Sequence, residues 1–123
     1  MSARRFRPDR DGLRLTADWI ASHQRDDGAI PSLRGRRMDP WDHVQSAMAL
    51  TVMGEHQRAR AAYRFLASSQ GEDGAWPAAS NCKAVIDATR ESNHAAYLAT
   101  GLWHFYRATG EVEFLREMWP TLA

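Results

Sequence analysis

Apolar residues recur along most of the chain at spacings of three and four, and this spacing predicts helices that each bury one face. Four such stretches lie at residues 13–21, 40–52, 59–67 and 95–106, and a shorter one follows at 112–118. No stretch alternates between apolar and polar positions as a half-buried strand does. The pattern therefore predicts an all-α chain of antiparallel helical hairpins.

The connections between these helices differ in length. Asp39 and Pro40 form a helix start, as N-cap and first helical residue, and Thr89–Ser92 opens the fourth helix. The turns at Gly54-Glu55 and Thr109-Gly110 are short, whereas the loops over residues 25–38 and 71–88 are long. Alternate connections fall on opposite ends of an antiparallel bundle, so both long loops are expected at one end, where binding sites typically lie.

The chain contains an internal repeat. At an offset of 46, residues 19–32 align with residues 65–78, and seven of the fourteen positions are identical. Each copy holds Gln-x-x-Asp-Gly followed by proline, so each predicts a helix that ends at the glycine. A glutamine there can bond the backbone of a neighbouring helix, and Asp-Gly forms the turn, so we expect these residues to be structural.

The segment Gln70-Gly-Glu-Asp-Gly-Ala-Trp76 resembles the Q-x-x-D-G-x-W repeat, or QW motif, of the α/α-toroid proteins, which include terpene cyclases and protein prenyltransferases. Gln24 to Ile30 matches it with isoleucine in place of tryptophan. The likeness extends to bacterial prenyltransferase-like proteins. It implies an enzyme that binds an isoprenoid or similar substrate at the rim where the inner helices of the ring begin.

Residues 103–120, with Tyr106, Thr109-Gly110, Phe114-Leu115 and Trp119-Pro120, resemble a hairpin of the six-hairpin glycosidases. This second resemblance implies a carbohydrate-active protein as the alternative. Both families form rings of helical hairpins, and 123 residues suffice for about two and a half of them. We therefore expect part of an α/α toroid over residues 12–123, an incomplete six-hairpin barrel in an N-terminal fragment of a longer protein.

Charge is distributed unevenly. Residues 1–11 form a predicted basic arm, and a second basic cluster lies in the loop at residues 34–37. Arginine outnumbers lysine fifteen to one in the whole chain, which indicates a general bias rather than a nucleic-acid surface. The chain has no apolar run long enough to span a membrane and no signal peptide, so we expect a cytoplasmic protein. Cys82, the single cysteine, allows no internal disulfide.

By the geometry of the resembling families, the helices that begin at Pro40 and Arg90 form the inner ring. Asp42 and Glu91 then face one cavity as a candidate catalytic acid and base pair. The candidate substrate-binding residues at the same helix starts are Trp41, His43, Asp87, Arg90, Asn93 and His94. The histidine spacing is not that of a zinc site, and no metal or other cofactor is expected.

Structural interpretations stand beside these roles. Asp39 is the helix cap, Asp42 completes a capping box, and Glu91 favours the helix dipole. Arg90 pairs with Asp87 or Glu91, both histidines are ordinary polar residues, and Trp41 packs between hairpins. A third function class also stays open, in which the chain is a non-catalytic helical-repeat module. The unclosed edge of such a module would bind a partner. For the chain as a whole, the expected partners are a small-molecule or glycan substrate and a second copy bound through the open edge of the ring.

Overall fold

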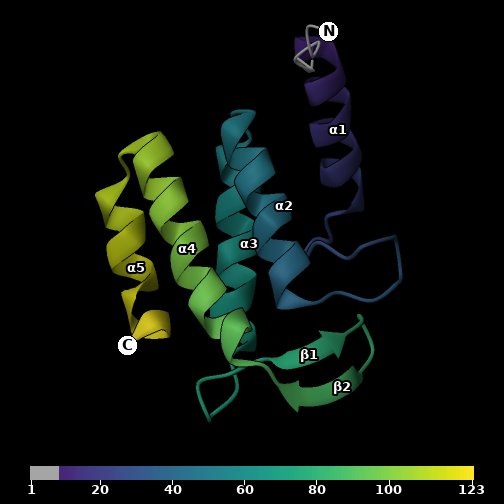
Figure 1. Cartoon of the computed structure of the whole chain (residues 1–123), viewed down its shortest axis with the longest axis vertical. Helices are drawn as coiled ribbons and strands as arrows, with labels where there is room; N and C mark the ends of the chain where they lie inside the picture. Colours follow the sequence, from purple (N-terminus) through teal and green to yellow (C-terminus); the bar gives the residue numbers. More distant parts are fainter. Residues whose placement is uncertain (1–8) are drawn as a thin grey trace, which may run out of the picture.

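The computed structural model describes residues 9–123 (Figure 1). Residues 1–8, which hold most of the predicted basic arm, lie outside the described residues. Within the described part, the elements in chain order are α1 (Arg10–His23), α2 (Pro40–Val52), α3 (His56–Ser69), β1 (Pro77–Ser80), β2 (Val85–Arg90), α4 (Ser92–Thr109) and α5 (Val112–Leu122). Helix dominates, which confirms the all-α fold class, and no helix of the described part is long and apolar enough to cross a membrane.

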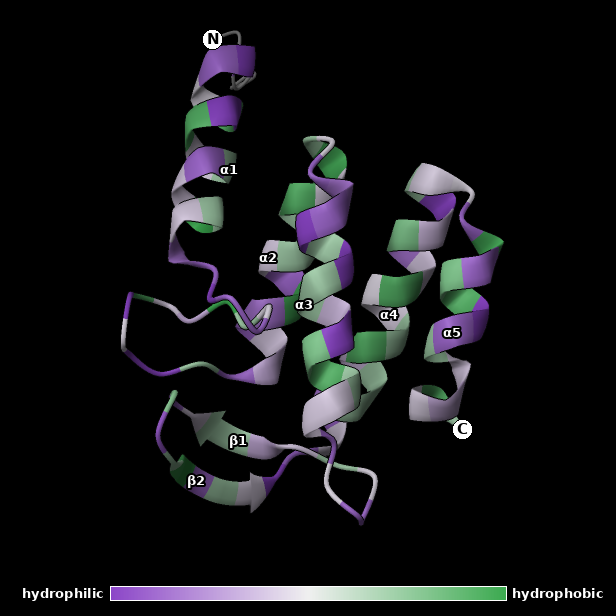
Figure 2. Ribbon diagram, turned by 180° about the vertical axis from the view of Figure 1, so that it is seen from behind, coloured by the Kyte–Doolittle hydropathy of each residue, from purple (hydrophilic) through white to green (hydrophobic). Residues whose placement is uncertain are grey.

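The helices pack in two layers. α2 contacts α4 in one layer, α3 contacts α5 in the other, and α2–α3 and α4–α5 pair across the layers, while α1 packs on the outer side of α2. The core between the layers includes Leu50, Tyr63, Leu66, Leu98 and Phe105, which are almost completely buried. Hydrophobic and hydrophilic bands accordingly alternate along α3, α4 and α5 (Figure 2). This arrangement buries one face of each of these helices.

The prediction that the chain contains no strand is wrong, because β1 and β2 pair as an antiparallel hairpin. β1 has the sequence Pro-Ala-Ala-Ser, which lacks β-branched and aromatic residues, and all six residues of β2 are exposed. Neither strand therefore shows the alternation that marks a half-buried strand. Asn81 forms the turn, since its side-chain Oδ1 accepts hydrogen bonds from the backbone N–H groups of Lys83 (2.8 Å) and Ala84 (2.9 Å).

The two long loops lie at one end of the helices, as predicted. Met38, at the end of the first loop, pairs with Ser80 of β1 through two backbone hydrogen bonds of 2.7 and 2.9 Å. Figure 1 shows the hairpin below the start of α2 and this loop beside it, between the end of α1 and the start of α2. We call this end of the molecule the rim, and it consists of residues 34–43 and 77–94.

Both copies of the repeat are structural, as predicted, but the helices end before the glycines: α1 ends at His23 and α3 at Ser69, with Gln24 and Gln70 as their C-caps. The Gln24 Nε2 donates to the carbonyls of Gly28 (3.1 Å) and Arg58 (2.9 Å), so it ties its own turn to the start of α3. The Gln70 Nε2 donates in the same way to Gly74 (2.9 Å) and to Thr121 near the end of α5 (3.0 Å). Gln24 therefore joins α1 to the start of α3, and Gln70 joins α3 to the end of α5.

Candidate functional site

The start of α2 places the first candidate carboxylate at the rim. The Asp39 side chain caps the helix by accepting a 2.9 Å hydrogen bond from the backbone N–H of Asp42, and Pro40 is the first helical residue, as predicted. Asp42 is exposed. Partial desolvation and, after it, the negative charge of Asp39 raise the pKa of Asp42, which the positive charge of Arg37 partly offsets. Asp42 is thus a solvent-accessible carboxyl that holds its proton more readily than an ordinary aspartate.

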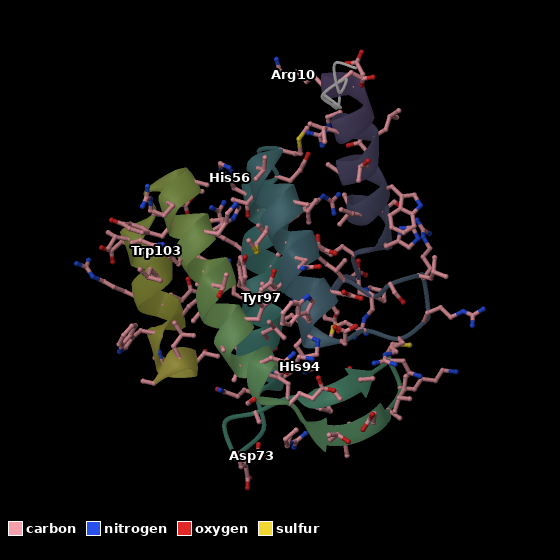
Figure 3. The ribbon with its side chains drawn as sticks, viewed as in Figure 1. Arg10, His56, Asp73, His94, Tyr97 and Trp103 are labelled. Atoms are coloured by element: carbon pink, nitrogen blue, oxygen red, sulfur yellow. The ribbon has the colours of Figure 1, made fainter. Side chains whose placement is uncertain are left out.

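An aromatic pair lies directly beside Asp42. The Trp41 indole stacks on the Tyr97 ring of α4, with 4.2 Å between ring centroids and an angle of 1° between the planes. Trp41 remains 36% exposed, so the pair bridges α2 and α4 while leaving aromatic surface open to solvent. Figure 3 shows Tyr97 on the side of α4 that faces α2. Both interpretations of Trp41, packing between hairpins and an open stacking surface, fit this position.

The second candidate carboxylate, Glu91, is the N-cap residue of α4 and has a side chain that is 45% exposed. Its Oε2 lies 3.4 Å from the Nε2 of His94. His94 is 5% exposed, and its Nδ1 makes no hydrogen bond with any part of residues 9–123. The structure therefore places Glu91 at the surface of the rim and His94 beneath it.

His43 lies in the core rather than on the surface of the rim. Its Nδ1 accepts a hydrogen bond from the backbone N–H of Ile30 (3.0 Å), and its Nε2 donates to the carbonyl of Ala62 (2.8 Å). Burial lowers the pKa of His43 to about 4. Both ring nitrogens are occupied by the backbone, so none is left for a substrate, and we assign His43 a structural role.

The helix expected to begin at Arg90 begins instead at Ser92, because Asp87 and Arg90 belong to β2. We expected Arg90 to pair with Asp87 or Glu91, and this expectation is wrong. The Arg90 Nε donates to the Asp73 Oδ2 at 2.9 Å. This contact ties the hairpin to the Asp-Gly turn of the second repeat and is the main cause of the lowered pKa of Asp73. Strand pairing displaced the expected helical start of this segment.

Asp87 and Asn93 lie exposed on either side of Glu91 along the chain. The Asp87 carboxylate accepts a 2.9 Å hydrogen bond from the backbone N–H of Thr89, which lowers its pKa, and the charge of Arg37 lowers it further. Arg37 therefore acts on carboxylates of both α2 and β2. It sits one residue before Met38, the residue that pins the first long loop to β1.

A groove of about 460 Å³ lies under the hairpin. Its lining includes Met38, Phe65, Trp76, Val85 and Arg90, and also the free, exposed Cys82. Within residues 9–123, no three His, Cys, Asp or Glu side chains gather as a metal site would require. The candidate chemistry of the rim thus consists of carboxylates and aromatic rings.

Sequence reasoning missed two residues, Arg37 of the rim and Tyr97 next to it. Tyr97 follows His94 by three positions and so falls near it on one face of α4, a signal that helical spacing contains. Arg37 belongs to the basic loop cluster, but its closeness to Asp42 and Asp87 depends on the pairing of Met38 with Ser80. That pairing joins residues 42 positions apart, and no local pattern predicts it.

Comparison with known proteins identifies the family. Residues 35–123 match the model of the mannosylglycerate hydrolase MGH1-like glycoside hydrolase domain. The chain is also 46% identical over 110 residues to an MMP endo-(1,4)-3-O-methyl-alpha-D-mannosidase of Mycolicibacterium hassiacum. That match covers 89% of this chain but 31% of the relative, so the chain spans less than a third of that protein's length.

These matches support the six-hairpin glycosidase resemblance, and neither supports the prenyltransferase and terpene-cyclase one that we had placed first. The glycan substrate class likewise replaces the isoprenoid as the expected ligand class. The family model includes the whole segment from Arg37 through Met38 to Asp42 and the start of α4. The chain therefore belongs to the family of the mannosylglycerate hydrolase MGH1-like glycoside hydrolase domain.

Proposed function

We propose that this chain forms the sugar-binding rim of a glycoside hydrolase that acts on α-linked mannosides. The observation that carries the proposal is a carboxyl group with a raised pKa, Asp42, adjacent in sequence to the exposed indole of the Trp41–Tyr97 stack. The membership of the chain in a glycoside hydrolase family supports it independently. The mannoside class is suggested by the names of the family and of the mannosidase relative.

Asp42 takes the role of general acid in this proposal. Glycoside hydrolysis needs one carboxyl group that is protonated when it meets the glycosidic oxygen, and a raised pKa favours that state. The physical causes are on the same helix start: Asp42 is partly desolvated and lies next to the ionised cap Asp39. Asp39 therefore has two effects, since it stabilises the first turn of α2 and favours the protonated form of Asp42.

The stacked aromatic pair supplies the sugar platform. A pyranose ring presents C–H groups on one face, which pack on an exposed aromatic ring, while its hydroxyl groups stay free for polar partners. Trp41 is held flat against Tyr97 and so needs no reordering when a sugar binds. Trp41 and Asp42 are both exposed in the first turn of α2, so a sugar on the platform would lie at the same helix start as the proposed acid.

Glu91 is the proposed second carboxylate, as base or nucleophile. It lies at the start of α4, the helix that packs against α2, so both carboxylates belong to the same end of the inner pair. Asp87, Arg90 and Asn93 flank Glu91 on β2 and in the first turn of α4 as further polar groups. We keep them as candidate contacts for sugar hydroxyls.

The test combines binding and turnover on the whole chain. We expect an α-1,4-linked 3-O-methylmannose oligosaccharide or mannosylglycerate to shift the NMR signal of the Trp41 indole N–H, and Trp41→Ala to abolish that binding. New reducing ends should form with wild type and be lost by at least 100-fold in Asp42→Asn, in line with typical general-acid contributions. Glu113→Gln, at an exposed position of α5, is the matched control and should behave as wild type.

Two outcomes would contradict the proposed catalytic roles of these residues while leaving the family membership of the chain intact. Binding without turnover supports the alternative of a non-catalytic glycan-binding module, and would show that catalysis needs more chain than these residues. Turnover that survives both Asp42→Asn and Glu91→Gln would overturn the assignment of the two carboxylates. A cytoplasmic location and self-association through the open edge stay predictions, and light scattering after size exclusion tests the second.

A further inference from the structure

Two histidines occupy the same position on the two inner helices. His43 begins the buried face of α2 that continues with Ala47 and Leu50, and His94 begins the buried face of α4 that continues with Leu98 and Gly101. The spacing within each set is four and then three residues, so the rings sit at equivalent depths in the first turns. Any difference in what they contact reflects a difference in role.

Their contacts do differ. Both nitrogens of His43 bond to backbone groups, those of Ile30 and Ala62. The His94 Nε2 instead lies 3.4 Å from the Glu91 Oε2, and its Nδ1 finds no hydrogen-bond partner among residues 9–123. The first ring is therefore a link between backbone segments, and the second is a support beneath a carboxylate.

Glu91 itself is free for such a contact. Asp39, at the start of α2, uses its side chain to cap the helix, whereas the Glu91 side chain forms no capping hydrogen bond with α4 in the described structure. A glutamate has three side-chain torsions, and an unrestrained one samples many rotamers at the surface. The buried ring of His94, 3.4 Å from the Glu91 carboxylate, is placed to restrict it.

We propose that His94 is a positioning residue for Glu91, holding its carboxylate at the rim through an Nε2–H donor. The proposal builds on the role of Glu91 under the proposed function. A carboxylate only accepts hydrogen bonds, so the Nε2 of His94 must carry a proton when it bonds to Glu91. His94 is 5% exposed and does not itself touch a substrate, whereas the half-exposed Glu91 does.

Nitrogen-15 NMR of the imidazole rings tests this in the intact chain. We expect His94 in the Nε2–H tautomer, and Glu91→Gln should shift its Nε2 and Hε2 resonances. His43 serves as the internal reference, because its Nε2–H bonds to the Ala62 carbonyl and should not move. A His94 ring protonated on Nδ1, or Nε2 resonances that Glu91→Gln leaves in place, would overturn the proposal.

Two variants of His94 separate positioning from packing. The amide of His94→Gln can place a donor where Nε2 lies, whereas the shorter His94→Asn matches Nδ1 and does not reach Glu91. We expect the side-chain order of Glu91, measured by carbon-13 relaxation, to be kept in His94→Gln and lost in His94→Asn. Equal order in the two variants contradicts the proposal. Since neither readout requires hydrolysis, failure of the catalytic assignment would leave this result standing, and the reverse holds too.

Discussion

Acidification should destabilise the fold through one buried side chain, His43. The ring is neutral in the folded chain, with Nδ1 accepting from the backbone N–H of Ile30 and Nε2 donating to the carbonyl of Ala62. A proton on Nδ1 would place two N–H groups against each other and bury a charge in the core. Burial accordingly lowers the pKa of His43 to about 4, from an ordinary value of 6.5.

The sign and size of this change in the free energy of unfolding follow from the pKa of His43 in the folded and unfolded chain. The unfolded chain takes up the proton first, so the contribution of His43 to stability is present above pH 6.5 and is lost as pH falls toward 4. At about 1.4 kcal/mol per pKa unit, the full loss is about 3 kcal/mol, of which about 2 kcal/mol falls between pH 7 and pH 5. A loss of this size is a large part of the stability of a small domain.

Urea unfolding followed by circular dichroism at pH 7, 6 and 5 measures this loss. The His43→Gln variant should be less stable at pH 7 but should lose much less stability on acidification than wild type. His23→Gln, at the end of α1, is the matched control and should keep the wild-type pH dependence. If His43→Gln does not fold, an NMR titration of wild-type His43 decides instead. A midpoint near 6.5, or equal pH dependence in wild type and His43→Gln, would refute the reasoning.

Two further changes test the repeat by thermal or urea unfolding. Both Gly28 and Gly74 have positive φ, but a Cβ on Gly28 would lie 2.2 Å from the Ala61 carbonyl oxygen, whereas one on Gly74 meets nothing within 4 Å. Gly28→Ala should therefore cost several kcal/mol and Gly74→Ala about 1 kcal/mol, and equal losses would contradict the account. Trp76→Phe, which removes the 2.9 Å bond to the buried Leu66 carbonyl, should cost about 1–3 kcal/mol; no loss would show that this carbonyl needs no partner.

The helices were predictable because their signals are local. Asp39 and Pro40 mark the start of α2, and the periodic apolar positions of α3 became core, whereas several of those in the other helices, such as Val52 and Trp103, are exposed. The hairpin was not predictable from local pattern, because β1 lacks strand-forming residues and β2 is exposed along its whole length. Its strands are fixed by pairing with each other and with Met38, and such contacts appear only when distant segments meet.

The candidate site was predicted in outline, and the error lay in the orientation of the helix faces. Trp41 and Asp42 were placed at the rim, where the structure has them exposed. His43 was grouped with them because it is adjacent in sequence. Its spacing of four and seven residues to the buried Ala47 and Leu50 already assigned it to the opposite, core-facing side. Helical spacing is thus a better guide than adjacency to which rim residues can meet a substrate.

The same spacing locates the hairpin in the sequence. His43 lies thirteen positions after Ile30 of the first turn, and His94 lies eighteen positions after the equivalent Trp76. The two turns and the two histidines are matched, so the five extra residues must lie in the second long loop, where β1 and β2 form. The repeats therefore coincide in the core and diverge at the rim. Chemistry that is particular to one repeat is expected at the rim, where the two repeats differ, and both Asp42 and Glu91 lie at the rim.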